Sequence, residues 1–277
     1  MSIFGTTRAA IDPVAIPLDP TGADRAAQRL RSAARRDGFA VFTVEDAHAS
    51  GPQAMASTAA LLGLGRAYVP AIYAREAQRF GYDSDGFNTI SAAVTDSGHR
   101  YFGTGAAQGF HTDGTLEGIG VVASSLLWFE RAAPEGGHTT IFRATEAFEV
   151  LRSTHPAAAA SLMSNDALTR VATSFQPQQS TTGPAFADLE VGLRTRWADD
   201  GNEIWTFNGE SGQLRELAVA RMREYSRPGS PFRTDLEISS RTGLLLCNTR
   251  VAHGRTAFHA EPGERILLRG LYTSEVR

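Results

Sequence analysis

Residues 244–255 read LLLCNTRVAHGR, an apolar run that leads into a histidine–glycine pair. A short apolar run of this kind is typical of a buried β-strand. A strand that runs into such a turn places His253 at the mouth of a β-barrel or jelly roll. His253 is therefore a candidate ligand at the open end of a β-fold.

The strand expected near the C-terminus carries two arginines on one face. Because strand side chains alternate, Arg265, Leu267 and Arg269 share a face, and Ile266 and Leu268 make the other face apolar. If the arginines face solvent, nothing follows from them. If they face the interior, each needs an anion, because an unpaired buried charge is costly. A ligand carboxylate held by a guanidinium is the natural partner.

The triplet His111-Thr112-Asp113 offers two metal ligands at a spacing of two residues. In an extended chain such residues point to the same side, so the imidazole and the carboxylate can reach one ion. With one more histidine they would form the facial triad that suits non-haem Fe(II). The alternative is a structural histidine at a turn, because a triplet this short arises often by chance.

Hydrophobic periodicity predicts a mainly β protein. We expect helices at residues 19–36, 51–64, 144–152, 157–164 and 213–225. We expect strands at residues 39–44, 121–131, 139–143, 191–197, 203–208, 236–239, 243–248 and 265–273. The turns at residues 134–137 and 199–202 are expected to join the strands that flank them, and residues 175–186 to form a loop. Short strands with a few flanking helices predict a double-stranded β-helix, or jelly-roll, core.

The chain is expected to form one domain over residues 1–277. In it, residues 1–65 would pack as a helix and strand unit on the core. Residues 66–110 mix aromatic side chains with Gly, Asp and Ser, and residues 175–212 are polar and irregular. Both segments are expected as lids over a site. Irregular surface packing around aromatic anchors is the alternative for the first of them.

Composition excludes several chemistries. The 277 residues carry a net charge of −3, which favours neither nucleic acid nor an anionic membrane as a partner. All 27 basic residues are Arg, so a Lys Schiff base and the usual phosphate-loop Lys are excluded. The single Cys247 excludes an internal disulfide and a four-Cys metal site. Without an apolar N-terminal stretch, we expect a soluble cytoplasmic protein that acts on a small molecule.

Four pieces of sequence occur in the order typical of one enzyme superfamily. They are residues 111–113 (HTD), residues 136–139 (GGHT), residues 248–258 (NTRVAHGRTAF) and Arg265, twelve residues after His253. With these pieces the chain resembles the Fe(II)/2-oxoglutarate-dependent dioxygenases of the taurine dioxygenase and clavaminate synthase-like superfamily. The resemblance covers residues 105–273 and implies a jelly-roll fold.

The resemblance also implies roles for individual residues. His111, Asp113 and His253 match the iron ligands of the family. Arg265 and Thr139 match the residues that hold the distal carboxylate of 2-oxoglutarate.

Two further positions are less regular. Arg269 matches a second arginine that several members place near the cosubstrate or an acidic substrate. His138 stands where an acidic or polar residue is usual and receives no role.

The resemblance implies an oxidoreductase that uses Fe(II), 2-oxoglutarate and O₂ and releases succinate and CO₂. Asp113 replaces the small residue of related halogenases, so we expect hydroxylation, or desaturation or ring closure, of a metabolite. A free or carrier-bound amino acid in a biosynthetic pathway is the expected substrate.

Two alternatives stay open. A zinc or other divalent-metal hydrolase could use the same ligands but would not need Arg265 at the metal cavity. A non-catalytic jelly-roll binding module would show no iron-dependent turnover of 2-oxoglutarate.

Overall fold

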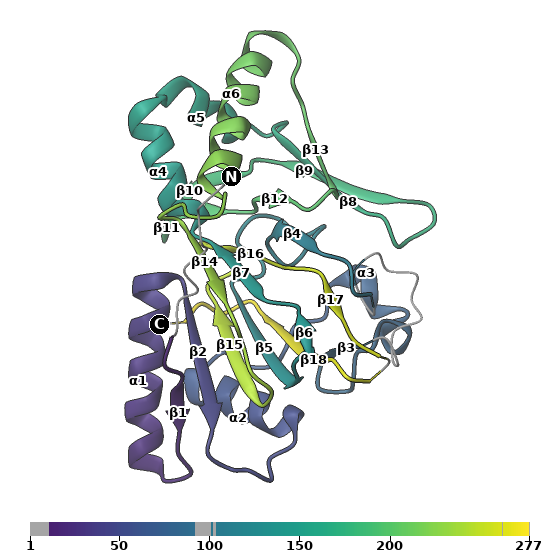
Figure 1. The fold of residues 1–277 in the computed structure, drawn as a ribbon. Coiled ribbons are helices and arrows are strands. Elements are labelled where there is room, and N and C mark those ends of the chain that lie inside the picture. Colours follow the sequence, from purple (N-terminus) through teal and green to yellow (C-terminus); the bar gives the residue numbers. More distant parts are fainter. Residues whose placement is uncertain (1–10, 92–100, 102–103, 262, 277) are drawn as a thin grey trace, which may run out of the picture.

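Two β-sheets form the centre of the molecule (Figure 1). The computed structural model describes residues 11–91, 101, 104–261 and 263–276. The six-stranded sheet has the order β1 (Val14–Ile16), β2 (Phe39–Val44), β15 (Thr242–Leu246), β5 (Ser124–Arg131), β18 (Ile266–Tyr272), β3 (Asn88–Ile90). The five-stranded sheet has the order β12 (Ala198–Asp199), β4 (Gln108–His111), β16 (Ala252–Arg255), β7 (Thr139–Phe142), β14 (Arg233–Leu236).

Smaller sheets and helices surround this centre. A three-stranded sheet and two strand pairs are formed by β13 (Glu203–Trp205), β8 (Leu168–Ala172) and β9 (Gln179–Gly183), by β10 (Phe186–Leu189) and β11 (Gly192–Thr195), and by β17 (Phe258–His259) and β6 (Glu135–Gly136). The helices are α1 (Pro20–Asp37), α2 (Gly51–Leu62), α3 (Ala71–Ala74), the 3₁₀ turn η1 (Ala77–Phe80), α4 (Ala144–Thr154), α5 (Pro156–Leu162) and α6 (Gly209–Tyr225).

Alternation along the strands divides the core into layers. In β5, Leu127 and Phe129 face the five-stranded sheet, where they join Ile141 in one buried cluster. The intervening Leu126 and Trp128 face the opposite way and pack in the cluster that contains residues of α1 and α2. A third cluster covers the far side of the five-stranded sheet with α4, α5 and α6. Side chains of both sheets therefore meet in the space between them.

The predicted mainly β jelly roll with flanking helices is confirmed. In the described part of the chain the sheets remain separate and do not close into a barrel. The first helix and the strand after it agree closely with the expectation. Asp19 accepts a hydrogen bond from the amide of Gly22, and Gly38 ends the helix in the left-handed region with φ 81°. These local signals explain why this helix was predictable.

Three predictions of local pairing are wrong. Residues 175–186, expected as a loop, contain β9, whose polar sequence gives no apolar alternation but pairs with β8. The turn at residues 199–202 does not join a hairpin, because β11 pairs with β10 and β13 pairs with β8. Strands β5 and β7 flank the turn at residues 134–137 but belong to different sheets.

Among the residues that the structure describes, no helix is both long and apolar enough to cross a membrane.

Candidate metal and cosubstrate site

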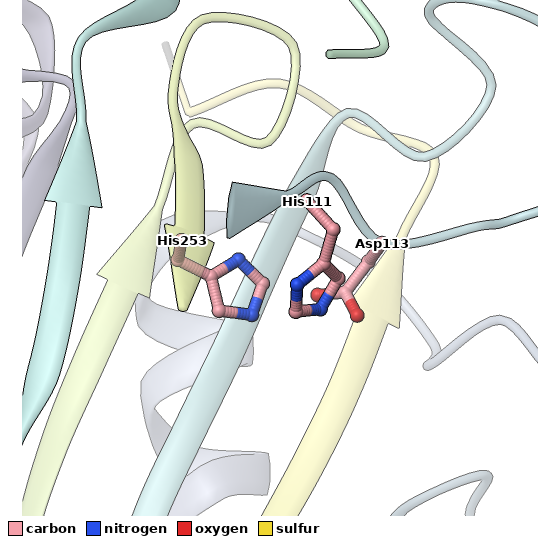
Figure 2. A group of neighbouring side chains, drawn as sticks. All are labelled: His111, Asp113 and His253. Carbon is pink, nitrogen blue, oxygen red and sulfur yellow. The ribbon is translucent and has the colours of Figure 1, made fainter. Parts of the chain in front are cut away.

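Two histidines face each other across neighbouring strands. His111 ends β4 and is the register partner of His253 in β16, with ring centroids 4.4 Å apart. Asp113 lies two residues after His111, and the ligand atoms of all three buried residues lie within 4.8 Å of one another. Figure 2 shows the two rings and the carboxylate gathered at one point. The structure thus brings together the three residues that the sequence predicted as metal ligands.

The carboxylate of Asp113 is held from the six-stranded sheet. Ser125 donates a hydrogen bond of 2.7 Å to Oδ2, and Arg269 donates one of 2.7 Å to Oδ1. Arg269 also donates to the side chain of Asn88 at 3.1 Å. Burial opposes ionisation of Asp113, but the charge of Arg269 and the hydrogen bond from Ser125 favour the ionised form, and its pKa lies well below the usual range. Asp113 is therefore ionised at neutral pH.

Asn248 fixes the backbone around Asp113. Its side-chain oxygen accepts from the Asp113 amide at 2.8 Å, and its side-chain nitrogen donates to the carbonyls of Asp113 at 3.2 Å and Val122 at 2.8 Å. Asn248 directly follows the apolar run that ends β15. Sequence reasoning assigned no role to Asn248 or Ser125, although Asn248 opens the motif that carries His253.

The imidazoles are in the neutral form that metal binding requires. Burial lowers the pKa of His111, and burial together with the nearby His111 lowers the pKa of His253 to about 3. The Nδ1 of His111 lies 3.1 Å from the Gly109 carbonyl, which fixes a proton on that nitrogen and leaves Nε2 as an acceptor. The Nδ1 of His253 is buried without a hydrogen-bond partner among the described residues. Two neutral imidazoles and one carboxylate therefore fit a divalent ion such as Fe(II).

The histidines make the metal-free protein sensitive to acid. An unfolded imidazole titrates near pH 6.5, whereas the pKa of His253 in the folded state is about 3. Between these values the unfolded state binds more protons, so the free energy of unfolding should fall as pH falls, by up to about 1.4 kcal/mol per pH unit for each imidazole. Urea unfolding with a chelator at pH 7.5, 6.0 and 5.0 measures this slope.

A matched pair of variants assigns the slope. His253→Ala should flatten the pH dependence, whereas His48→Ala, at an exposed position, should keep it. An unchanged slope in the His253 variant would contradict the burial of a neutral imidazole.

One cavity runs between the two main sheets, and we call it the inner cavity. Its lining includes Gln108, Leu127, Phe129, Thr139, His253 and Arg265. Arg265 is 7% exposed and lies with its guanidinium carbon 4.8 Å from the centroid of the Phe258 ring. Burial lowers its pKa to about 10, and no carboxylate of the described residues contributes to that pKa. A buried guanidinium of this kind fits an anionic ligand.

The neighbouring Arg255 is hydrogen-bonded to backbone carbonyl groups. Its guanidinium donates to the carbonyls of Tyr101 at 2.9 Å and Thr104 at 2.7 Å. Arg255 therefore fixes the wall beside Arg265.

A second cavity also borders the metal ligands His111 and Asp113, and we call it the outer cavity. Its lining includes Pro70, Tyr73, Tyr101, Thr115, Asp200 and Asn202. Gln108, His111 and Arg269 line both cavities. Residues of both expected lid segments thus form walls of the outer cavity, although residues 92–100 and 102–103 lie outside the described residues.

Arg269 has a different environment from the one the sequence suggested. The resemblance placed it near a cosubstrate or an acidic substrate, and in the structure it interacts with Asp113, Asn88 and Tyr82. It still lines both cavities, so contact with a ligand remains a prediction. The backbone amide of His138 donates to Thr256 Oγ1 at 3.0 Å, and the sequence signal at His138 stays without a role.

Arg170 in β8 supports the metal-ligand loop from the three-stranded sheet. It is 1% exposed and donates to the Thr112 carbonyl at 2.8 Å and to Thr112 Oγ1 at 3.1 Å. Thr112 lies between His111 and Asp113. No local sequence signal identified Arg170, because its partner lies 58 residues away along the chain.

Arg170→Met should lower the free energy of unfolding by about 1–3 kcal/mol, since it leaves a buried carbonyl without its donor. Urea unfolding of the metal-free protein measures this loss. The control is Arg221→Met, which removes an exposed pair with Glu224 and should cost less than about 1 kcal/mol. Equal effects of the two changes would mean that Arg170 does not hold the loop.

Comparisons with known proteins add to this geometry. The sequence model of the family described as taurine catabolism dioxygenase TauD, TfdA family matches residues 8–272. A uridine-5′-phosphate dioxygenase from Amycolatopsis sp is 33% identical over 250 residues, which cover 87% of this chain and 86% of that protein. A second protein of the same name, from Streptomyces sp, is 34% identical over 217 residues, which cover 76% of each chain.

The fold also resembles solved structures. One is an asparagine oxygenase in complex with Fe(II), 2S,3S-3-hydroxyasparagine and succinate, with a TM-score of 0.62 and 17% identity. The similarity covers 91% of this chain and 79% of that one.

Proposed function

This chain belongs to the TauD/TfdA family of dioxygenases, and on that premise we propose that it oxidises a nucleoside 5′-phosphate at the centre formed by His111, Asp113 and His253. The enzyme class itself follows from the family: it is a 2-oxoglutarate-dependent dioxygenase that uses Fe(II) and acts on a small molecule. The hydrolase and the non-catalytic module are thereby excluded.

The ligand geometry carries the proposal for the metal. His111, Asp113 and His253 would hold Fe(II), which with 2-oxoglutarate and O₂ supplies the oxidant for a C–H bond. The protein keeps both imidazoles neutral and the carboxylate ionised. Ser125 and Asn248 orient Asp113 from outside the ligand set. Such support restricts the ligands to one arrangement.

The inner cavity is proposed to bind 2-oxoglutarate. Arg265 would hold its distal carboxylate, and Thr139, buried in β7, would donate a hydroxyl hydrogen bond to the same group. The apolar walls formed by Leu127 and Phe129 would exclude water from the chain of methylene groups. His253 lines the same cavity, so a ligand bound there would reach the metal centre.

The outer cavity is proposed to bind the substrate. The two relatives named as uridine-5′-phosphate dioxygenases support a nucleotide substrate, because the aligned region covers at least 76% of the length of each relative. Arg269, which lines this cavity, is the cation proposed to meet the phosphate. The free or carrier-bound amino acid remains a second prediction, since the asparagine oxygenase at 17% identity supports the fold alone.

Other predictions stand beside this one. We retain a single domain whose segments 66–110 and 175–212 act as lids. A cytoplasmic location and the absence of a nucleic-acid or membrane partner also remain proposals.

The test is turnover of uridine 5′-phosphate by the Fe(II)-loaded protein with 2-oxoglutarate and O₂. Consumption of the nucleotide in step with succinate formation would support the proposal. Succinate formation with an amino acid panel, and none above background with nucleotides, would replace the nucleotide by an amino acid.

A further inference from the structure

Asp200 is held rigidly at the wall of the outer cavity. Its carbonyl accepts a hydrogen bond from the Tyr101 hydroxyl, and its amide donates to Glu203 Oε2 at 3.0 Å. Glu203 Oε2 also accepts from the amide of Gly201 at 2.8 Å. Tyr101 comes from one expected lid segment and Asp200 from the other. The position of the Asp200 side chain is therefore determined by both.

The carboxylate of Asp200 has acceptor capacity left. Asn202 donates to it twice, from its amide to Oδ1 at 3.1 Å and from its side chain to Oδ2 at 3.3 Å. An ionised carboxylate offers about four lone-pair sites. Asp200 is 8% exposed, so donors from bulk water are scarce there. A ligand in the cavity is the natural source of the remaining donors.

Asp200 lies at the cavity that borders the metal centre. It lines the same cavity as the metal ligands His111 and Asp113. Arg269 lines this cavity too. The cavity thus offers one cationic and one anionic side chain beside the ligands. A substrate that carries an anion and, elsewhere, hydroxyl donors matches this pattern of charge.

We propose that Asp200 accepts hydrogen bonds from the sugar hydroxyls of the substrate and so makes the enzyme selective for ribonucleotides. This inference rests on the proposed function, because it assumes a nucleotide in the outer cavity. A neutral hydroxyl pair suits the site better than a cation, since Asn202 already donates to both carboxylate oxygens and the cation Arg269 lines the same cavity.

The alternative is a purely structural Asp200 that acts through Arg170. Asp200 is the first of the charges that raise the pKa of Arg170, which in turn holds Thr112. Loss of that support would weaken turnover of every substrate equally. If the loss of turnover is confined to substrates that carry the sugar hydroxyl groups, Asp200 recognises the substrate and does not merely support Arg170.

The experiment compares uridine 5′-phosphate with its 2′-deoxy and 3′-deoxy analogues on the Fe(II)- and 2-oxoglutarate-loaded enzyme. We expect the wild type to have a kcat/KM about 10- to 100-fold higher for the ribonucleotide than for at least one deoxy analogue. Asp200→Asn should remove most of this difference, mainly by raising KM for the ribonucleotide. The matched control is Asp199→Asn, whose exposed partner is Arg223, and it should keep the wild-type ratio.

Direct binding gives a second readout. Anaerobic titration of each nucleotide, followed by the change in the visible Fe(II)–2-oxoglutarate band, should show the same loss of affinity for the ribonucleotide alone. The band itself should be intact in Asp200→Asn.

Each contrary result has its own meaning. Equal kcat/KM values for the three nucleotides in the wild type overturn the inference without any variant. So does a parallel fall for all three in Asp200→Asn. If the wild type converts no nucleotide but converts an amino acid, the proposed function fails first, and the inference about sugar hydroxyls fails with it.

Discussion

His111→Ala is expected to abolish turnover while the fold survives. The change removes one of three ligands at the point where both cavities meet. Loss of groups that merely orient a ligand already costs 10- to 100-fold, so succinate formation should fall by more than about 100-fold. Among the described residues, the nitrogens of the His111 side chain contact Gly109 and Gln108, so thermal unfolding of the metal-free protein should change little.

Spectroscopy separates loss of the centre from loss of the protein. The wild type should develop a visible band when Fe(II) and 2-oxoglutarate are added without oxygen, and His111→Ala should not. Full turnover in that variant would contradict the ligand assignment.

Asp113→Ala makes an informative contrast, because we expect it to lower the free energy of unfolding more than His111→Ala does. It removes the anion that faces Arg269, whose side chain is 11% exposed. An uncompensated buried charge costs about 3–5 kcal/mol.

Arg265→Ala should raise the KM for 2-oxoglutarate by about 100-fold with little change in kcat at saturation. The guanidinium is proposed to contact the end of the cosubstrate that does not react, so it contributes equally to the ground state and the transition state. A charge-assisted pair of two hydrogen bonds in a buried cavity accounts for an effect of this size. Initial rates of succinate formation against 2-oxoglutarate concentration measure it.

Arg265→Lys tests the geometry of the contact. Lys keeps the charge but lacks the planar fork, so we expect an intermediate rise in KM of about 10-fold. Arg131→Ala is the matched control, because that exposed side chain donates to the Gly263 carbonyl away from the cavity. Wild-type dependence on 2-oxoglutarate in Arg265→Ala would show that the cosubstrate is held elsewhere.

The centre could be predicted from sequence where its signals are local. The period of two in the strand predicted at residues 265–273 places Arg265, Leu267 and Arg269 on one face, and the structure has all three at the inner cavity. His111 and Asp113 need only an extended chain to point the same way. His253 was predicted as the third ligand because it follows an apolar strand and matches a ligand position in the superfamily pattern. The roles that the resemblance implies for Thr139, Arg265 and Arg269 remain predictions.

The support of the centre could not be predicted, because it depends on partners far along the chain. Arg269 meets Asp113 across 156 residues, and Asn248 meets it across 135. Strand β9 has no apolar face of its own and is stabilised by pairing with β8. Pairings of this kind follow from topology, and no local pattern in the sequence reports them.

The contact between Asp113 and Arg269 has a consequence for the order of assembly. The protein itself supplies the counter-charge to its buried carboxylate, and both histidines are neutral. The polypeptide therefore neutralises its own interior before any cation arrives. In zinc fingers, by contrast, the ion is needed for the chain to fold at all. We therefore expect the apoprotein to fold before it binds iron, so that one purified preparation can be emptied with a chelator and reconstituted with Fe(II).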